Sequence, residues 1–315
     1  MVISAFFIVA TISRVDLAEV GAALSRVNFA VVLLAIPVVA SELVLRAIRW
    51  QRLLQPIGTV TLARSAAYLA IGYFANSMLP ARLGDVARAF LAGRAFGISR
   101  LAVLGTIVVE RLADGVFILI VVAVLGLTVA GGATLASTAL LLTGLGVVGL
   151  LVLAVGIVWL RRPGAGRIRL RVGSFLERVL LGVRSLRSPS VAAGTTLLTI
   201  AAFGTAVVMF ALVANAAGAG LTLAQSALVM GGLALSTSIP AGPGSIGTYE
   251  FVGLTILTSL GVAPELALAI VVLVHLVATL PAALVGLLAT WRLHFRFSEI
   301  AADSDPGNLT ASEPS

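Results

Sequence analysis

Long apolar segments separated by short polar stretches make up most of the chain. A membrane-spanning helix needs about 20 predominantly apolar residues. The segments that approach this length are 1–12, 28–48, 62–80, 100–127, 136–160, 190–214, 222–239, 247–261 and 264–290. This pattern predicts an all-α fold, a polytopic bundle of transmembrane helices. We expect 1–12 to be a short first helix, or the end of one that starts upstream.

Two of these segments are interrupted at a proline in the same way. Aligning Pro80 with Pro240 also pairs Ser77 with Thr237. Proline removes a backbone donor and clashes with the preceding helical turn, so neither segment is expected to run as an unbroken helix. Broken backbone at membrane depth is tolerated only where protein buries it or where it lines a cavity.

The breaks predict an internal repeat and a binding site. The expected hinge residues are Pro80, Pro240, Gly242, Pro243, Gly244 and Gly247. Interrupted segments at corresponding places in two halves are the best sequence pointer to a transporter-type site. We therefore expect half-repeats at about 28–130 and 136–290, with inverted topology, within one membrane domain at 1–297. The polar tail at 298–315 is expected to be disordered.

Composition excludes several classes of protein. The 315 residues are 60% hydrophobic and 11% charged, with a mean hydropathy of +1.14, whereas soluble domains carry about 25% charged residues. With no cysteine, disulfides and thiolate chemistry are excluded. The net charge is +8 and all 21 basic residues are arginine, which in a membrane protein indicates basic loops and anionic lipid rather than nucleic acid.

The arginines also predict topology, because cytoplasmic loops carry the excess of basic residues. The arginine-rich loops are 46–64, 82–100, 161–187 and 292–296, and the uncharged, external connections are 128–135 and 215–221. Because basic loops flank 62–80 on both sides, this segment is expected to be re-entrant, with a full span as the alternative. The second break fits either two half-helices or two ordinary spans. The segment 161–187 fits an interfacial amphipathic helix or a solvated loop equally well.

Charged residues follow the first break at helical spacing. Arg82, Asp85 and Arg88 are three residues apart, which on a helix lets Asp85 pair with both arginines. This arrangement fits a pocket for a phosphate head group, oriented by the acid. A cytoplasmic helix that neutralises its own charges is the alternative.

A second charged group lies inside an apolar segment. Glu110 and Asp114 are one helical turn apart and need a neighbouring cation, for which Arg111, Arg82 and Arg88 are the candidates. Ionisable residues inside membrane helices face the bundle interior and are functional candidates by default. We therefore predict a functional role for this group.

Other polar residues have simpler interpretations. Glu250 either lies near a bound anionic head group or caps the helix that follows the second break. His275 is interpreted as a packing residue in an apolar helix. Arg46, Arg49 and Trp50 end the second span, where interfacial anchoring explains them.

Taken in order, these residues resemble the lysylphosphatidylglycerol synthase transmembrane-region family, also called flippase-like domain proteins. The residues that carry the resemblance are Arg49-Trp50, Asn76, Leu79-Pro80, Arg82-Leu83-Gly84-Asp85, Arg88, Glu110-Arg111, Asp114, Pro240, Pro243-Gly244-Ser245-Ile246-Gly247 and Glu250. The resemblance covers about 30–290, and Asp85 stands where the family often has Glu. Full synthases add a soluble aminoacyl-transferase domain, so lipid aminoacylation is not supported here.

The resemblance implies a bacterial plasma-membrane protein that translocates lipids with phosphate or polyprenyl-phosphate head groups. The residues expected to hold the head group are Arg82, Arg88 and Arg111. Those expected to orient them or to exchange protons are Asp85, Glu110, Asp114 and Glu250. No catalytic residue, metal or cofactor is implied, and the absence of lysine excludes a phosphate-binding loop of the ATPase type.

Two other functions stay open at this point. One is an intramembrane lipid-modifying transferase that uses Glu110 and Asp114 with a divalent ion. The other is a non-catalytic partner of a cell-envelope synthase. Membrane lipids are the expected partners. A cell-envelope synthase and a second copy of the chain are further candidates.

Overall fold

The computed structural model describes residues 2–129, 144, 188–239 and 241–293. The described chain is helical throughout and contains no strand, which confirms the all-α bundle. Several predictions fall wholly or mostly on residues outside these ranges: the candidate span 136–160, the loops 128–135 and 161–187, Pro240 and the tail 298–315.

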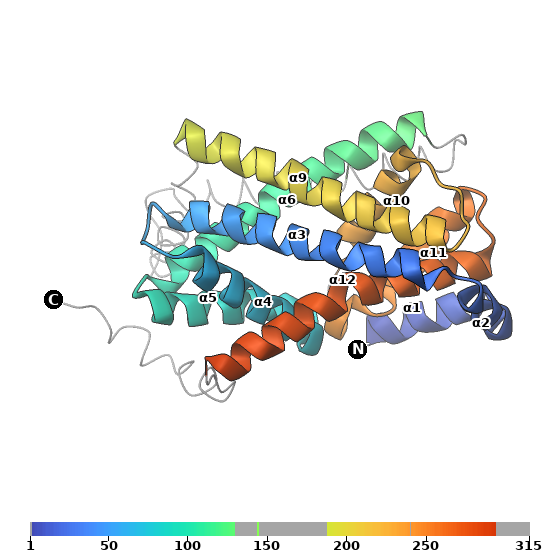
Figure 1. The fold of residues 1–315 in the computed structure, drawn as a ribbon, viewed down its shortest axis with the longest axis horizontal. Coiled ribbons are helices and arrows are strands. Elements are labelled where there is room, and N and C mark those ends of the chain that lie inside the picture. The colour runs from blue at the N-terminus through green and yellow to red at the C-terminus, as the bar shows by residue number, and fades with distance from the viewer. Residues whose placement is uncertain (1, 130–143, 145–187, 240, 294–315) are drawn as a thin grey trace, which may run out of the picture.

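Four long helices form the body of the molecule (Figure 1): α3 (Phe29–Leu54), α6 (Arg100–Thr128), α9 (Pro189–Ala216) and α12 (Pro264–Arg292). By length and composition, α3, α9 and α12 can each cross a membrane. α6 is as long as α12, with 29 residues, and carries the charged group centred on Arg111. α3 packs along α9 in the most extensive helix pair of the described structure.

The first proline break is the tip of a helical hairpin. α4 (Leu62–Met78) leads into the 3-10 turn η1 (Pro80–Arg82), and α5 (Leu83–Phe96) packs back against α4. Leu79 is extended, with φ −103° and ψ 142°, because a residue before proline avoids the helical region. Arg82 then takes a left-handed conformation, with φ 58°, which reverses the chain.

Small residues let the two arms of this hairpin approach closely. A Cβ atom at Gly84 would lie 2.4 Å from the carbonyl oxygen of Gly72, and the rings of Tyr68 and Phe96 stack edge to face at the far end. The hairpin therefore starts and finishes at the same end of the bundle, with its tip inside. This is the re-entrant alternative for the segment.

The prediction of a basic loop at 82–100 is wrong for most of its length. The segment forms α5, which supplies the returning arm of the hairpin. The charge that suggested a loop is carried in part by Arg88, and this side chain is buried because it meets a carboxylate on α6. An arginine that is paired inside the bundle does not require a loop.

The second break has the same form. α10 (Leu223–Ser236) is followed by the turn η3 (Pro243–Ser245) and by α11 (Thr248–Ser259), which packs back on α10. The 14 and 12 residues of these helices rise about 21 Å and about 18 Å, less than the roughly 30 Å of a bilayer core. A Cβ at Gly232 would lie 2.2 Å from Cδ1 of Ile256. The half-helix alternative therefore holds, and the two-span alternative is wrong.

The two hairpin tips meet in the middle of the molecule. η1 contacts η3, and Nη2 of Arg82 donates a hydrogen bond of 2.6 Å to Oγ1 of Thr237. The hairpins enter from opposite ends of the bundle, and each lies in sequence between two long helices (Figure 1). The order helix, hairpin, helix thus occurs twice with opposite direction, as expected for an inverted repeat. The half-repeat boundaries stay a prediction.

Two short helices precede this arrangement. α1 (Val2–Ile12) has 11 residues, which rise about 16 Å and are too few to cross a bilayer. It packs on α11, and Oγ of Ser4 accepts a 2.7 Å hydrogen bond from the backbone nitrogen of Gly242. The next helix is α2 (Leu17–Ser25), and the side chain of Asp16 caps its N-terminus. The N-terminal segment therefore closes over the second break.

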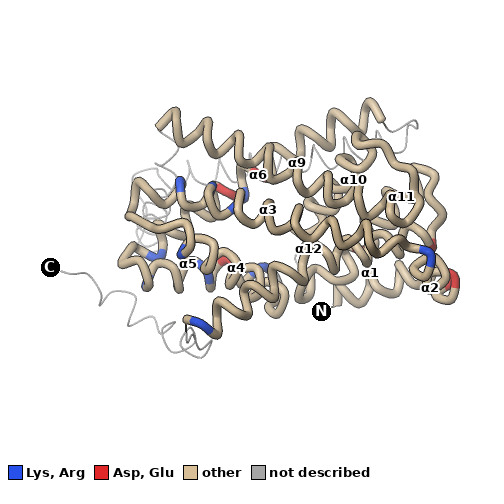
Figure 2. Tube along the Cα trace, in the orientation of Figure 1, with Lys and Arg blue, Asp and Glu red and all other residues tan. Residues whose placement is uncertain are grey.

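The charged residues are unevenly distributed along the long axis. Figure 2 shows most of the arginines in the half of the molecule that contains α4 and α5, with a smaller group of charges at α2. The described arginine-rich segments therefore gather at one end, as the topology argument requires. The assignment of that end to the cytoplasm stays a prediction.

The close contact between α4 and α5 gives a first test. A methyl group at Gly84 meets backbone atoms of Gly72 and Asn76 within 2.5 Å, and backbone cannot move aside as a flexible side chain does. We expect Gly84→Ala to lower the free energy of unfolding by about 1–3 kcal/mol, seen as a lower thermal midpoint in detergent. The control Gly204→Ala on α9 meets no atom within 4 Å and should leave the midpoint unchanged. Equal midpoints for the two variants would contradict this packing.

Candidate functional site

A cavity of about 530 Å³ lies where the two hairpin tips meet. Its polar side is formed by residues from both tips and from α6, among them Asn76, Arg82, Asp85, Arg111, Thr237 and Ser245. Its apolar side is formed by side chains of α6, α9 and α10, among them Phe117, Phe203 and Met230. The cavity is therefore amphipathic, with charge on one wall and hydrocarbon on the other.

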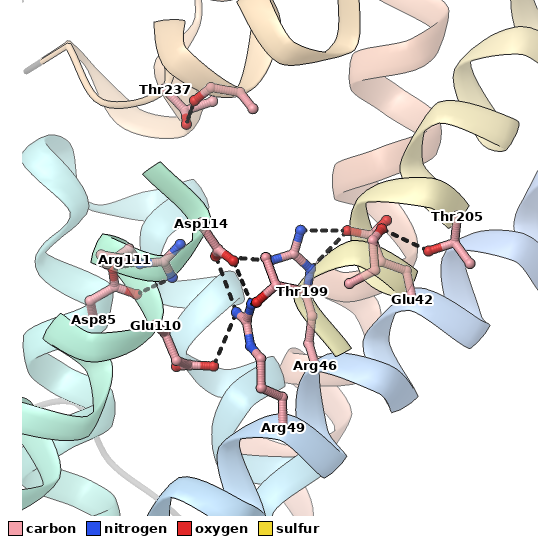
Figure 3. Close-up of polar contacts among 12 residues, drawn as sticks. Glu42, Arg46, Arg49, Asp85, Glu110, Arg111, Asp114, Thr199, Thr205 and Thr237 are labelled. Atoms are coloured by element: carbon pink, nitrogen blue, oxygen red, sulfur yellow. Dashed lines mark hydrogen bonds and ion pairs between the residues drawn. The ribbon is translucent and has the colours of Figure 1, made fainter. Parts of the chain in front are cut away.

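Asp114 on α6 lies at the edge of this cavity and is held by two arginines of α3 (Figure 3). Arg49 contacts both carboxylate oxygens, with 3.1 Å between Nη2 and Oδ2, and Arg46 lies 3.5 Å away. Arg46 also pairs with Glu42 one turn earlier on α3, and Arg49 donates a 2.7 Å hydrogen bond to Thr199 on α9. These contacts fasten α3 to α6 and α9.

Glu110 lies one turn earlier on α6 and is buried more deeply. Its carboxylate pairs with Arg88 from α5 and lies 3.4 Å from Nη2 of Arg49. All three side chains are at most 2% exposed. The guanidinium of Arg88 stacks 3.9 Å from the ring centre of Trp50, whose Nε1 donates a hydrogen bond to Thr106. Glu110 and Arg88 thus lie behind the cavity wall rather than in it.

Asp85 makes a different pair from the one that its spacing predicted. Nε and Nη2 of Arg111 donate to its two oxygens at 3.1 and 3.2 Å, and Asn76 donates to Oδ1 at 3.2 Å. The predicted pairing with Arg82 and Arg88 is wrong. Arg82 precedes the first residue of α5 and has left-handed backbone, so it does not share the helix face, and Arg88 faces α6.

Arg82 differs from the other arginines around the cavity. It lines the cavity, and in the described part of the chain no carboxylate lies within ion-pair distance of it. Its described side-chain partner is the hydroxyl of Thr237 on the opposite tip. Of the charged residues at this site, the arginines are Arg46, Arg49, Arg82, Arg88 and Arg111, and the acids are Glu42, Asp85, Glu110 and Asp114. The surplus positive charge is therefore at Arg82.

Glu250 caps a helix, as one of its two interpretations expected, and it does not line the cavity. Its Oε2 accepts a 2.6 Å hydrogen bond from the nitrogen of Gly247, whose φ is 94°. Its Oε1 lies 2.5 Å from Nδ1 of His275, and Nε2 of that ring lies 3.0 Å from the carbonyl oxygen of Gly244. His275 is therefore more than a packing residue, because it joins α12 to the second tip.

The predicted hinge residues that the structure describes, all except Pro240, lie in or next to the two turns, and their role as hinges stays a prediction. Pro80 and Pro243 begin η1 and η3, and Gly244 and Gly247 have positive φ values of 64° and 94°. Gly242 and Gly244 also line the cavity.

The interpretation of Arg46, Arg49 and Trp50 as interfacial anchors is wrong. α3 continues to Leu54, beyond its predicted end, so Arg49 and Trp50 are buried inside the bundle and Arg46 reaches the cavity. One signal was available in the sequence. Glu42, Arg46 and Arg49 are spaced four and three residues apart, so they lie on one helix face. This face carries two arginines and one acid, and the second arginine therefore needs an acid from another segment.

Comparison with known proteins agrees with the resemblance drawn from the motifs. A family model described as the lysylphosphatidylglycerol synthase TM region matches residues 1–286, so the chain belongs to this family. No match was found among curated proteins.

The buried ion pair and the cavity-facing arginine should contribute differently to stability. Glu110→Ala leaves Arg88 buried without a carboxylate in the described structure, and removing one partner of a buried pair costs about 3–5 kcal/mol. We expect a loss of this size in the unfolding free energy of the purified protein. Arg82→Ala removes one hydrogen bond to Thr237 and should cost less, about 1.5 kcal/mol, the lower end for a bond that involves a charged group. Similar losses in both variants would contradict this division of roles.

Proposed function

We propose that this member of the lysylphosphatidylglycerol synthase TM-region family binds the anionic head group of a lipid in the cavity between its hairpin tips and helps it to cross the membrane. The observation that carries the proposal is Arg82, a cavity-lining guanidinium without a described carboxylate partner. Its neighbours Asp85 and Arg111 neutralise each other, so the cavity offers positive charge at one point.

The polar groups around Arg82 suit a phosphate. A guanidinium presents parallel N–H donors that match two phosphate oxygens. Tyr249 also lines the cavity, and within the described structure its hydroxyl is buried without a hydrogen-bond partner. A buried polar group without a partner is unfavourable, and an oxygen-rich head group would supply one. Asn76 Oδ1, equally unpartnered, fits the hydroxyl groups of such a head group.

The arrangement of the hairpins supports movement of the head group. Each hairpin enters from a different end of the bundle and ends at the cavity, so broken backbone faces the ligand from both directions. The apolar wall, with Phe117 and Phe203, suits the hydrocarbon near the head group. Lipid tails thus stay in an apolar environment while the head group crosses.

The residues divide into three roles in this proposal. Arg82 binds the phosphate, and Arg111 adds a second donor while Asp85 orients it. Arg88 and Glu110 keep the cavity wall in place from behind, because both are fully buried. A transferase that holds a divalent ion on Glu110 and Asp114 gains no support, since arginines occupy both carboxylates.

Lipid binding tests the role of Arg82. We expect Arg82→Gln to weaken the binding of phosphatidylglycerol by about ten- to a hundredfold, because a hydrogen bond to a charged group contributes about 1.5–3 kcal/mol. Native mass spectrometry with added lipid measures the occupancy. The matched control Arg64→Gln removes the same charge from an exposed position at the start of α4 and should keep its occupancy. Equal occupancy in both variants would overturn the assignment.

The same pair of variants tests translocation. In vesicles that contain the purified protein, the rate at which a labelled phosphatidylglycerol crosses the bilayer should fall with Arg82→Gln and not with Arg64→Gln. If binding falls and the crossing rate equals that of protein-free vesicles for every variant, including the unaltered chain, the cavity binds lipid without moving it.

A further inference from the structure

The imidazole of His275 lies between two groups that both accept hydrogen bonds. Nδ1 lies 2.5 Å from Oε1 of Glu250, and Nε2 lies 3.0 Å from the carbonyl oxygen of Gly244. The ring also stacks on Tyr249, with 4.3 Å between the ring centres. The position of the ring is thus set by contacts on three sides, and both of its nitrogens are engaged.

Counting protons limits the states in which both contacts are hydrogen bonds. A neutral imidazole has one N–H, an ionised carboxylate has none, and a backbone carbonyl can only accept. Satisfying both contacts therefore needs one additional proton on the pair. Either the ring is an imidazolium that donates twice, or Glu250 is a carboxylic acid that donates to Nδ1 while Nε2–H donates to Gly244.

We propose that His275 and Glu250 form a proton-binding site that latches the tip of the second hairpin, and that loss of the proton releases Gly244. After the proton leaves to water, one N–H stays on the ring. It is retained by the carboxylate, because hydrogen bonds to ionised acceptors are about twice as strong as neutral ones. The carbonyl of Gly244 then faces a nitrogen lone pair and has lost its donor.

The released residue belongs to the cavity wall. Gly244 lines the cavity, has a φ of 64°, and its position would place a Cβ 4.0 Å from the carbonyl oxygen of Ser77 on the first hairpin. The contact between Glu250 and Gly247 does not depend on the proton, so α11 keeps its cap in both states. The change is therefore confined to the turn η3.

In the described structure, no other charged group contacts His275 or Glu250, so the charge of the pair depends on its own proton. In the described part of the chain, Glu250 is the charged group within ion-pair distance of His275. From α11, Tyr249 faces the ring, and η3 contributes the carbonyl of Gly244 and no ionisable group. The ionisable residues on the other elements packed against α12 are Glu19, Glu42, Arg46, Arg49, Arg52, Arg64, Tyr68 and Tyr73. None of these has a described hydrogen bond or ion pair with His275 or Glu250.

The side chains of His275 and Glu250 are 12% and 15% exposed, so the pair is not completely enclosed by protein. The latch goes beyond lipid binding, because it depends on the second tip alone and not on which ligand the cavity takes.

The cysteine-free chain allows a direct test with one reporter thiol. Ala241→Cys places the thiol at a buried position of the second tip, on the cavity wall. The rate of maleimide labelling in lipid nanodiscs is measured from about pH 5 to pH 9. Thiol reactivity itself rises with pH because the thiolate is the nucleophile. Each rate is therefore divided by that of the same reporter in a Glu250→Gln background.

Glu250→Gln is the conservative variant that should keep the latch closed. Its amide oxygen accepts from Gly247 and its amide N–H donates to Nδ1, which leaves Nε2–H on Gly244 at every pH. We expect a rate ratio near one at low pH that rises several-fold as the native pair loses its proton. In His275→Phe, which keeps the ring and removes both contacts, the ratio should be high throughout.

Two outcomes would overturn the latch. One is a ratio that does not change with pH in the native pair, and this result is decisive even if His275→Phe fails to fold. The other is parallel labelling of Ala75→Cys, a buried control on α4, because general loosening would then explain the signal. Neither outcome affects the role of Arg82, which is measured by lipid occupancy.

Discussion

The structure depends on the neutralisation of two carboxylates of α6, Glu110 and Asp114, inside an apolar bundle. Charges that are removed from water are stable only when they are paired and well hydrogen-bonded. The partners come from α3 and α5, Arg49 reaching both acids and Arg88 reaching one. Because these contacts are buried, they fix three helices relative to one another. One arginine of the site, Arg82 at the tip of the first hairpin, has no carboxylate partner in the described structure.

A second constraint is the need to satisfy broken backbone away from water. Each break is closed by short-range devices, a proline-led 3-10 turn and residues with positive φ. Side chains from elsewhere complete them: Ser4 accepts from Gly242, and His275 contacts Gly244. Arg82 itself stays in a left-handed conformation, which costs a non-glycine residue about 1–3 kcal/mol. A glycine would take this conformation without that cost, so the presence of arginine here is consistent with a function for its side chain.

The sequence predicts the breaks and the hairpin well, because proline acts locally and arginine restricts topology in a simple way. It predicts side-chain pairing poorly. The spacing of Arg82, Asp85 and Arg88 assumes one continuous helix face, whereas α5 begins only at Leu83. Arg49 was assigned to the interface because the apolar run ends at 48, while the helix continues into the bundle. Pairing between distant segments is a tertiary property, and a single sequence carries few signals for it.

The two hairpin tips differ in their charged groups, and in the described structure only that of the first tip lines the cavity. The first carries Arg82, a guanidinium that stays protonated at any physiological pH. The second is held by His275 and Glu250, whose contacts require one proton. The tips are joined by the hydrogen bond from Arg82 to Thr237, which ends α10 in the same tip as Gly244. Arg82 therefore contacts the second tip at the end of α10, outside the turn η3 that His275 holds. The second tip is thus fastened at two points, to the first tip through Thr237 and to α12 through Gly244, and in the proposed latch only the contact at Gly244 depends on a proton.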